Sequence, residues 1–96
     1  MRVHLRPQAE ADLRGIHDYI AQFDRRRAES FVLELRRKVE ALSHMPDAYP
    51  YVGRGDVRRR IHERYLILFR LNKHLEEVSI LRILHSARDL SLLELL

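Results

Sequence analysis

The sequence predicts an α+β fold, in which a hairpin of two helices packs on a mostly antiparallel four-stranded sheet. Apolar residues recur at helical spacing in two consecutive segments of the first half, and the second half holds three short runs rich in strand-forming residues. A chain of 96 residues is also too short to bury two separate cores. Because the helices come early and most strands come later, we expect one domain over residues 1–96 with the order β-α-α-β-β-β.

The first half is predicted to form a short strand and two helices. Residues 3–5 are the strand, and Pro7 suits the first turn of a helix because its missing N–H has no partner there. An apolar stripe follows at spacings of three and four residues: Ala9, Leu13, Ile16, Ile20 and Phe23. Asp24 is expected to cap the second helix through its carboxylate. The stripe of that helix is Ala28, Phe31, Val32, Leu35, Val39 and Leu42.

The second helix is expected to end at residues 44–47, because the residue before Pro46 is pushed out of the helical region. Only a few residues join the two helices, so they should lie antiparallel as a hairpin. Residues 49–56 contain one proline and two glycines and are interpreted as a loop. The tail, residues 89–96, is expected to form a short helix with Asp89 as its cap. Its leucines are expected to dock on the core of their own domain, and the alternative is a surface that antitoxin or target covers.

Three strands are predicted in the second half, over residues 57–61, 65–71 and 77–84. The middle one is apolar apart from Arg70, as expected of a central strand. In the first one, alternation places two arginines on one face and the third on the other. If Val57, Arg59 and Ile61 face the helices, then the side chains that point outward are those of Arg58 and Arg60.

Composition restricts the class of protein and favours an acidic partner. The net charge is +4, and residues 1–50 carry nine basic and eight acidic side chains, whereas residues 51–96 carry nine and six. A genome rich in arginine codons explains much of the arginine content, and nucleic acid or an acidic protein is the functional explanation. Cysteine is absent and no apolar run is long enough for a signal peptide or a membrane span, so we expect a cytoplasmic protein.

Motifs for metal, cofactor and hydrolase chemistry are absent from the sequence. No two histidines have the three- or four-residue spacing of a helical metal site, and there is no H-E-x-x-H motif. There is also no G-x-S-x-G and no glycine-rich phosphate loop. We therefore expect neither a metal nor a cofactor.

Three segments carry a resemblance to a known family. Residues 5–13 read LRPQAEADL, residues 65–71 read YLILFRL and residues 80–89 read ILRILHSARD. In this order and spacing they resemble the ParE/RelE superfamily of bacterial toxins, and the last segment is close to an ending common in ParE-like members. The resemblance implies the β-α-α-β-β-β fold and a cognate antitoxin that neutralises the toxin. It also implies growth inhibition and a role of the plasmid-stabilisation type.

The superfamily contains two kinds of toxin. RelE-like members cut mRNA in the ribosomal A site, whereas ParE-like members poison DNA gyrase and lack the cleaving residues. Where RelE-like toxins have an arginine in the central strand, this chain has Leu66; a second basic position falls near Ser86, and the terminal aromatic falls near Leu92 or Leu93. These differences remove positive charge and proton-transfer groups together, so they favour a gyrase-inhibiting, non-catalytic toxin.

Candidate site residues divide between binding and catalysis. A ribosome-dependent mRNA endonuclease is the alternative function, with His85 as acid–base group beside Arg82 and Arg88; against it, His85 only caps the strand end and hydrogen-bonds to backbone. The candidates for target or antitoxin binding are Arg58, Arg60, Arg64, Arg82, His85 and Arg88, and a solvated basic face is their structural alternative. A third possibility is a toxin fold that has lost toxicity and binds its antitoxin only.

Overall fold

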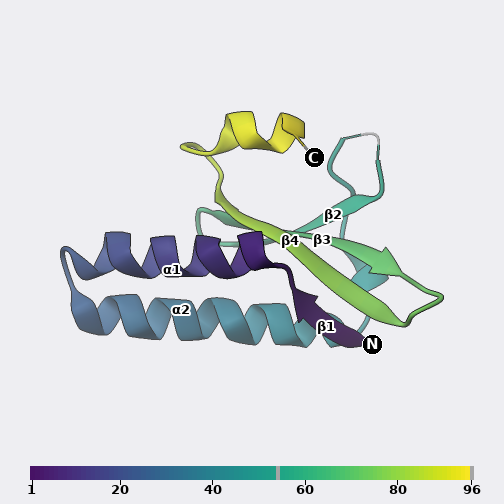
Figure 1. Ribbon diagram of the computed structural model, residues 1–96, viewed down its shortest axis with the longest axis horizontal. Coiled ribbons are helices and arrows are strands. Elements are labelled where there is room, and N and C mark those ends of the chain that lie inside the picture. Colours follow the sequence, from purple (N-terminus) through teal and green to yellow (C-terminus); the bar gives the residue numbers. More distant parts are fainter. Residues whose placement is uncertain (54, 96) are drawn as a thin grey trace.

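The computed structural model describes residues 1–53 and 55–95, with the side chain of Leu95 not described. Its elements are β1 (Arg2–Leu5), α1 (Pro7–Ala21), α2 (Arg25–Glu40), β2 (Val57–His62), β3 (Tyr65–Asn72) and β4 (Glu77–His85), with short 3-10 helices between and after them. The two helices cover one face of the sheet, and the C-terminal 3-10 helix η3 (Leu90–Leu95) lies on the other side (Figure 1). The predicted α+β fold and element order are confirmed.

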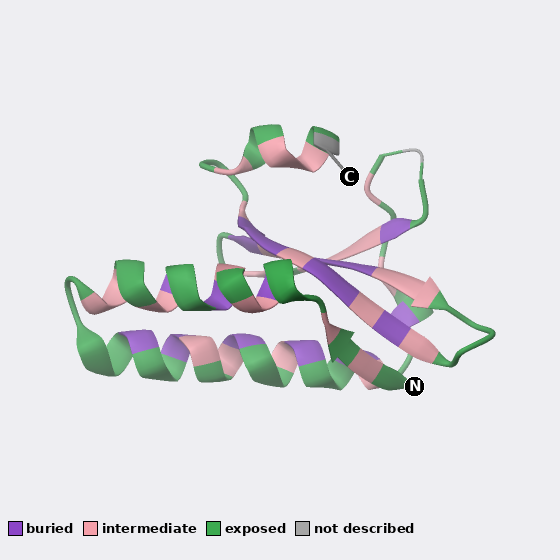
Figure 2. Ribbon diagram, viewed as in Figure 1, coloured by how far each residue is buried: buried purple, intermediate pink, exposed green. Residues whose placement is uncertain are grey.

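The sheet has the strand order β1-β4-β3-β2. Strands β2, β3 and β4 pair antiparallel, and β1 joins the edge by pairing parallel with β4, in a register that places Val3 beside Val78. The prediction of a mostly antiparallel sheet with a central strand at residues 65–71 is therefore confirmed. Figure 2 shows that buried residues follow the two middle strands and the side of α2 that faces α1.

The helical hairpin forms for the reasons that its sequence suggests. Pro7 occupies the first turn of α1, and the Oδ1 atom of Asp24 accepts a hydrogen bond of 3.1 Å from the backbone N–H of Arg27 at the start of α2. The buried apolar residues of the two helices are Ala9, Leu13, Ile16, Ala28, Phe31, Leu35 and Val39. Both predicted stripes thus point to the sheet, and the cap is confirmed.

Phe23 does not belong to the first stripe, contrary to prediction. Helix α1 ends at Ala21, so the helical period that would turn Phe23 toward the core is already lost. Its side chain is 76% exposed, and it meets the ring of Tyr19 edge-to-face at 5.7 Å between centroids. The end of the hairpin therefore carries an exposed aromatic pair.

The end of α2 is near the predicted place, and a 3-10 turn extends it. The α-helix stops at Glu40 and a 3-10 turn over Ala41–Ser43 continues it, burying Leu42. Met45, before Pro46, lies outside the right-handed helical region, as expected, and adopts the left-handed region at φ 49. A second 3-10 turn, Pro46–Ala48, follows directly and redirects the chain toward the loop and β2.

Strand β2 has the opposite facing to the one considered from its sequence. Arg58 pairs with Phe69 and Arg60 pairs with Ile67, and both partners belong to the core beneath the helices. Val57 packs instead with Leu68 on the other side of the sheet. Directly opposite residues share a face, so Arg58 and Arg60 lie on the helix side and do not point away from it. Three successive arginines carry no apolar contrast that would have revealed this phase.

The tail docks on its own domain, as predicted. Leu92 and Leu93 pack against Val57, Leu68, Leu81 and Leu84, whereas Leu90 is 58% exposed. The carboxylate of Asp89 does not cap the tail helix: its Oδ2 atom accepts a 2.8 Å hydrogen bond from the backbone N–H of His85, which lies before it in the chain. Leu96 and the side chain of Leu95 lie outside the described residues. The described residues include no helix with the length and hydropathy needed to cross a membrane.

The side chain of Asp12 joins α1 to the edge of β4 where β1 no longer covers it. Pairing with β1 ends with a hydrogen bond from the Arg6 backbone N–H to the Ile80 carbonyl. Beyond that point Asp12 Oδ2 accepts from the Ile83 backbone N–H at 2.8 Å, and both carboxylate oxygens accept from the Arg82 guanidinium at 2.9 Å. We call these three hydrogen bonds the Asp12 contact.

The Asp12 contact is shielded from water, because only 13% of the Asp12 side chain and 22% of the Arg82 side chain are exposed. The hydrogen bond to Asp12 raises the pKa of the Arg82 guanidinium further, so the pair stays charged on the basic side. A register shift between β3 and β4 near Leu68 coincides with Arg82, which pairs with Leu68. Such bulges redirect side chains, and this one lies where Arg82 reaches the edge of β4 and meets α1.

Substitution Asp12→Ala is expected to lower the free energy of unfolding by about 2–3 kcal/mol, because it leaves the Ile83 N–H and a shielded guanidinium without their acceptor. The matched control is Glu10→Ala, on the same helix. Glu10 forms a more exposed ion pair with Arg36 at 3.1 Å, so its loss should cost less than about 1 kcal/mol. Urea denaturation of the three proteins measures both values. Equal losses in the two variants would contradict the role of the Asp12 contact.

Candidate functional site

A hollow opens at the end of the sheet where β4 ends and β3 begins, beside the C-terminal half of α1. Its volume is about 600 Å³, and it is open to solvent. Its lining residues come from α1, α2, the β2–β3 turn, the start of β3, the end of β4 and the segment after it: Tyr19, Ile20, Arg27, Phe31, Glu63, Arg64, Tyr65, His85 and Arg88. We call it the Arg88 hollow. It combines an aromatic and aliphatic floor with arginines at its rim.

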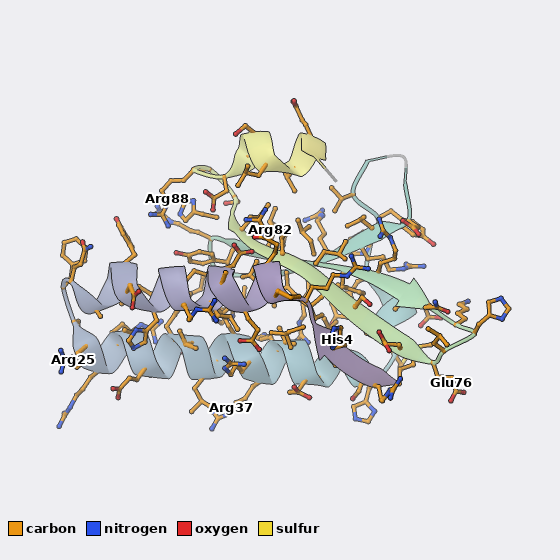
Figure 3. The ribbon with its side chains drawn as sticks, viewed as in Figure 1. His4, Arg25, Arg37, Glu76, Arg82 and Arg88 are labelled. Carbon is orange, nitrogen blue, oxygen red and sulfur yellow. The ribbon has the colours of Figure 1, made fainter. Side chains whose placement is uncertain are left out.

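Arg88 is held between two tyrosines. Its guanidinium donates a hydrogen bond of 3.1 Å to the hydroxyl of Tyr65 and lies 4.4 Å from the ring centroid of Tyr19. In Figure 3, Arg88 lies over the C-terminal half of α1, and Arg82 lies over its N-terminal half. Cation–π contact and the hydrogen bond thus fix the direction of a charge that is otherwise on an exposed segment.

Tyr65 is the buried member of this group. Burial raises the pKa of its hydroxyl above the usual value, and the opposing effect of the neighbouring Arg88 charge is smaller. Its ring also meets His85 edge-to-face, with 5.2 Å between centroids, and Phe31 at 5.5 Å. At neutral pH Tyr65 is therefore a neutral hydrogen-bonding group, able to hold Arg88 without cancelling its charge.

The imidazole of His85 is used by the backbone of the turn after β4. Its Nδ1 atom accepts hydrogen bonds of 3.1 Å from the backbone N–H groups of Ala87 and Arg88. An Nδ1 atom that accepts carries no proton, so the neutral ring holds its proton on Nε2. Protonation at Nδ1 would break both bonds. The interpretation of His85 as a cap of the strand end is confirmed, and the turn that it closes positions Arg88.

The predicted site residues fall into three separate places. Arg64, His85 and Arg88 meet at the hollow, where the Arg64 carbonyl also accepts a 2.7 Å hydrogen bond from the Ser86 N–H. Arg82 is turned away to Asp12. Arg60 donates to the Lys38 carbonyl at 3.1 Å, so neither Arg60 nor Arg82 is directed at His85.

Arg58 supports the loop before β2. Its guanidinium donates to the carbonyls of Asp47 and Tyr49 at 3.0 and 2.6 Å, and to the Tyr51 hydroxyl at 2.7 Å. It also lies 4.0 Å from the centroid of the Tyr51 ring. Together with the bond from Arg60 to the end of α2, these contacts give the two β2 arginines a structural function that their sequence pattern did not indicate.

Six lining residues were not predicted as part of a site: Tyr19, Ile20, Arg27, Phe31, Glu63 and Tyr65. Phe31 and Tyr65 have the apolar pattern of core residues, and they do contribute to the core. Tyr19 directly precedes the stripe residue Ile20, so its place in the sequence puts an aromatic side chain beside the apolar stripe; in the structure it is 47% exposed. Their meeting with His85 depends on the pairing of Tyr65 with His85 across β3 and β4, which local sequence patterns do not determine.

The fold is a small α+β one, and the Arg88 hollow gives it a basic surface lined by aromatic rings. Residues 3–90 match the family described as the ParE toxin of the type II toxin–antitoxin system parDE. The chain belongs to this ParE toxin family. No curated protein gives a significant match to the sequence.

Solved structures of toxin–antitoxin systems share the fold. A chain of the chromosomal ParDE system from P. aeruginosa has a TM-score of 0.77 and 24% identity, covering 88% of this chain and 95% of that chain. A chain of the toxin–antitoxin complex RelBE2 from Mycobacterium tuberculosis has a TM-score of 0.69 and 20% identity, covering 90% and 91%. At these identities the likeness concerns the fold, which is common to the ParE and RelE branches.

The raised pKa of Tyr65 predicts a late step in tyrosine ionisation. Followed by tyrosinate absorbance, one of the four tyrosines should ionise above the ordinary range near pH 10, and Tyr65→Phe should remove that step. Because the folded pKa is raised, the associated stability is complete below the unfolded pKa and is lost as pH rises through the folded one. Arg88→Gln should move the step higher. A Tyr65→Phe curve that differs only at lower pH would contradict this.

Proposed function

We propose that this toxin inhibits DNA gyrase by binding it through the Arg88 hollow, and that a cognate antitoxin holds it inactive in the cytoplasm. The proposal rests on membership of the ParE toxin family. The resemblance of the sequence to ParE-like toxins implies gyrase poisoning and a neutralising partner. The observation that carries it is the surface of the hollow, where arginines surround an aromatic floor. Aromatic residues and arginine are the residue types that contribute most energy to protein interfaces.

The state of the possible catalytic groups supports binding over cleavage. Cutting RNA through its 2′-hydroxyl needs a base, an acid and a cation beside the scissile phosphate. Here Arg82 has both guanidinium arms on Asp12, and His85 uses Nδ1 for two backbone bonds. Leu66 occupies the position where RelE-like relatives carry an arginine. The geometry thus favours a toxin that acts without chemistry of its own.

The antitoxin is expected to bring acidic and apolar side chains to the same surface. Arg64 and Arg88 supply positive charge, and Tyr19, which is 47% exposed, supplies apolar area at the rim of the hollow. Acidic groups opposite these arginines would speed association and fix the orientation of the partner. Covering the hollow would also block the gyrase-binding surface, so one site explains both toxicity and its neutralisation.

The decisive experiment is induction of the toxin without antitoxin, with DNA and mRNA examined in parallel. Gyrase inhibition predicts filamentous cells, gyrase-linked DNA breaks and intact messages, and loss of supercoiling activity when purified toxin is added to gyrase. Codon-positioned mRNA cuts that require ribosomes and disappear in His85→Ala would establish the endonuclease alternative and end this proposal. Antitoxin binding without growth arrest would identify a binding module that has lost toxicity.

Charge reversal at the rim tests the site itself. Arg64→Glu should raise the toxin concentration that inhibits gyrase about tenfold or more, because an attractive contact becomes repulsive. Arg64 is exposed in the β2–β3 turn, so the fold should survive. The control is Lys73→Glu, equally exposed in the turn at the opposite end of β3. Equal inhibition by both variants would place the gyrase contact elsewhere on the toxin.

A further inference from the structure

Three potential metal ligands meet beside the β2–β3 turn, next to the Arg88 hollow. Glu34 comes from α2, His62 ends β2, and Glu63 lies in the turn. The His62 Nε2 atom is 3.5 Å from Glu34 Oε1 and 3.6 Å from Glu63 Oε2. One donor atom of each residue lies within 4.8 Å of the other two. Helix α2 and the adjacent pair at the end of β2 thus converge on one point.

The His62 imidazole is an unusual member of this group. Its Nε2 atom is buried and has no hydrogen-bond partner. Among the described residues, no other buried side-chain nitrogen or oxygen lacks a partner. The ring packs on Phe31, with 5.3 Å between centroids, and only 12% of the side chain is exposed. Buried polar atoms are nearly always satisfied, so a nitrogen without a hydrogen-bond partner that faces two carboxylates is a candidate ligand for a cation.

The distances suit a divalent transition ion. Zinc bonds to histidine nitrogen and carboxylate oxygen are about 2.0–2.2 Å long, so adjacent ligand atoms of a tetrahedral site lie about 3.3–3.5 Å apart. The two distances from His62 Nε2, 3.5 and 3.6 Å, are close to this value. We propose that Glu34, His62 and Glu63 bind a zinc-class ion, with water in the fourth position. Glu63 is half-exposed, so a small side-chain rotation can bring its oxygen closer to Glu34.

Arg27 supplies the positive charge that lies beside the two carboxylates. Its guanidinium donates to Glu34 Oε2 at 2.6 Å and to Glu63 Oε2 at 3.2 Å, and it lies 5.0 Å from the Phe31 ring centroid. It therefore holds the two carboxylates beside His62. Glu34 can keep Arg27 on Oε2 and offer Oε1 to the ion, whereas the Glu63 oxygen near His62, Oε2, is the same one that accepts from Arg27. The ion and Arg27 compete for Glu63.

Titration of the chelator-treated full chain with zinc chloride, followed by calorimetry, tests the proposal. We expect one ion per chain, and a thermal transition that rises with zinc concentration because the ion binds the folded state. Glu34→Gln and Glu63→Gln should each weaken binding about tenfold or more, since even outer-shell partners of metal ligands have effects of that size. Glu29→Gln, an exposed change on the same helix, should leave the affinity unaltered.

Substitution of Arg27, which competes with the ion for Glu63, distinguishes a metal site from a merely structural cluster. Arg27→Gln should tighten zinc binding, although it removes two ion pairs from the apo protein and would lower stability in a merely structural cluster. Nitrogen-detected NMR of the imidazoles should assign coordination to His62 Nε2. Absence of stoichiometric binding, or binding that is unchanged in Glu34→Gln and Glu63→Gln, would show that other histidines account for any zinc uptake and would overturn the site.

Discussion

The carboxylate of Asp12 takes over the edge of β4 at the point where β1 ends, and the position of α1 depends on it. Strand β1 covers β4 only as far as Ile80, and the next stretch of backbone would otherwise face the helix with an unpaired N–H at Ile83. By accepting that N–H and the guanidinium of Arg82, Asp12 fixes α1 against the sheet. Tyr19 lies about two turns further along the same helix and lines the Arg88 hollow. The Asp12 contact therefore also fixes the position of this part of the hollow.

The arginines that suggested one basic patch have three different functions in the folded chain. Arg58 and Arg60 satisfy backbone carbonyls of the loop before β2 and of the end of α2. Arg82 completes the Asp12 contact. Arg64 and Arg88 remain at the surface of the hollow, and Arg88 is oriented by its two tyrosines. Positive net charge therefore says little about a binding face until the carbonyl and carboxylate partners of each guanidinium are known.

Sequence patterns predicted what local periodicity controls, and missed what strand pairing controls. The two helical stripes, the Asp24 cap and the apolar central strand were all evident, because each depends on neighbours within a few residues. The facing of β2 was not, since Arg58, Arg59 and Arg60 look alike on either face. Phe23 fitted the spacing of its stripe but lies beyond the end of the helix. The Glu34, His62 and Glu63 cluster escaped notice because adjacent residues of a turn and a distant helix have no helical metal spacing.

The parallel pairing of β1 with β4 has a consequence for the folding of the newly synthesised chain. Strand β1 has its partner in β4, with Arg2 beside Glu77, so the sheet remains incomplete until β4 has been synthesised. Contacts across so long a stretch of chain are slow to form. Until β4 has been made, β3 lacks one of its neighbours and the Arg88 hollow lacks His85 and Arg88.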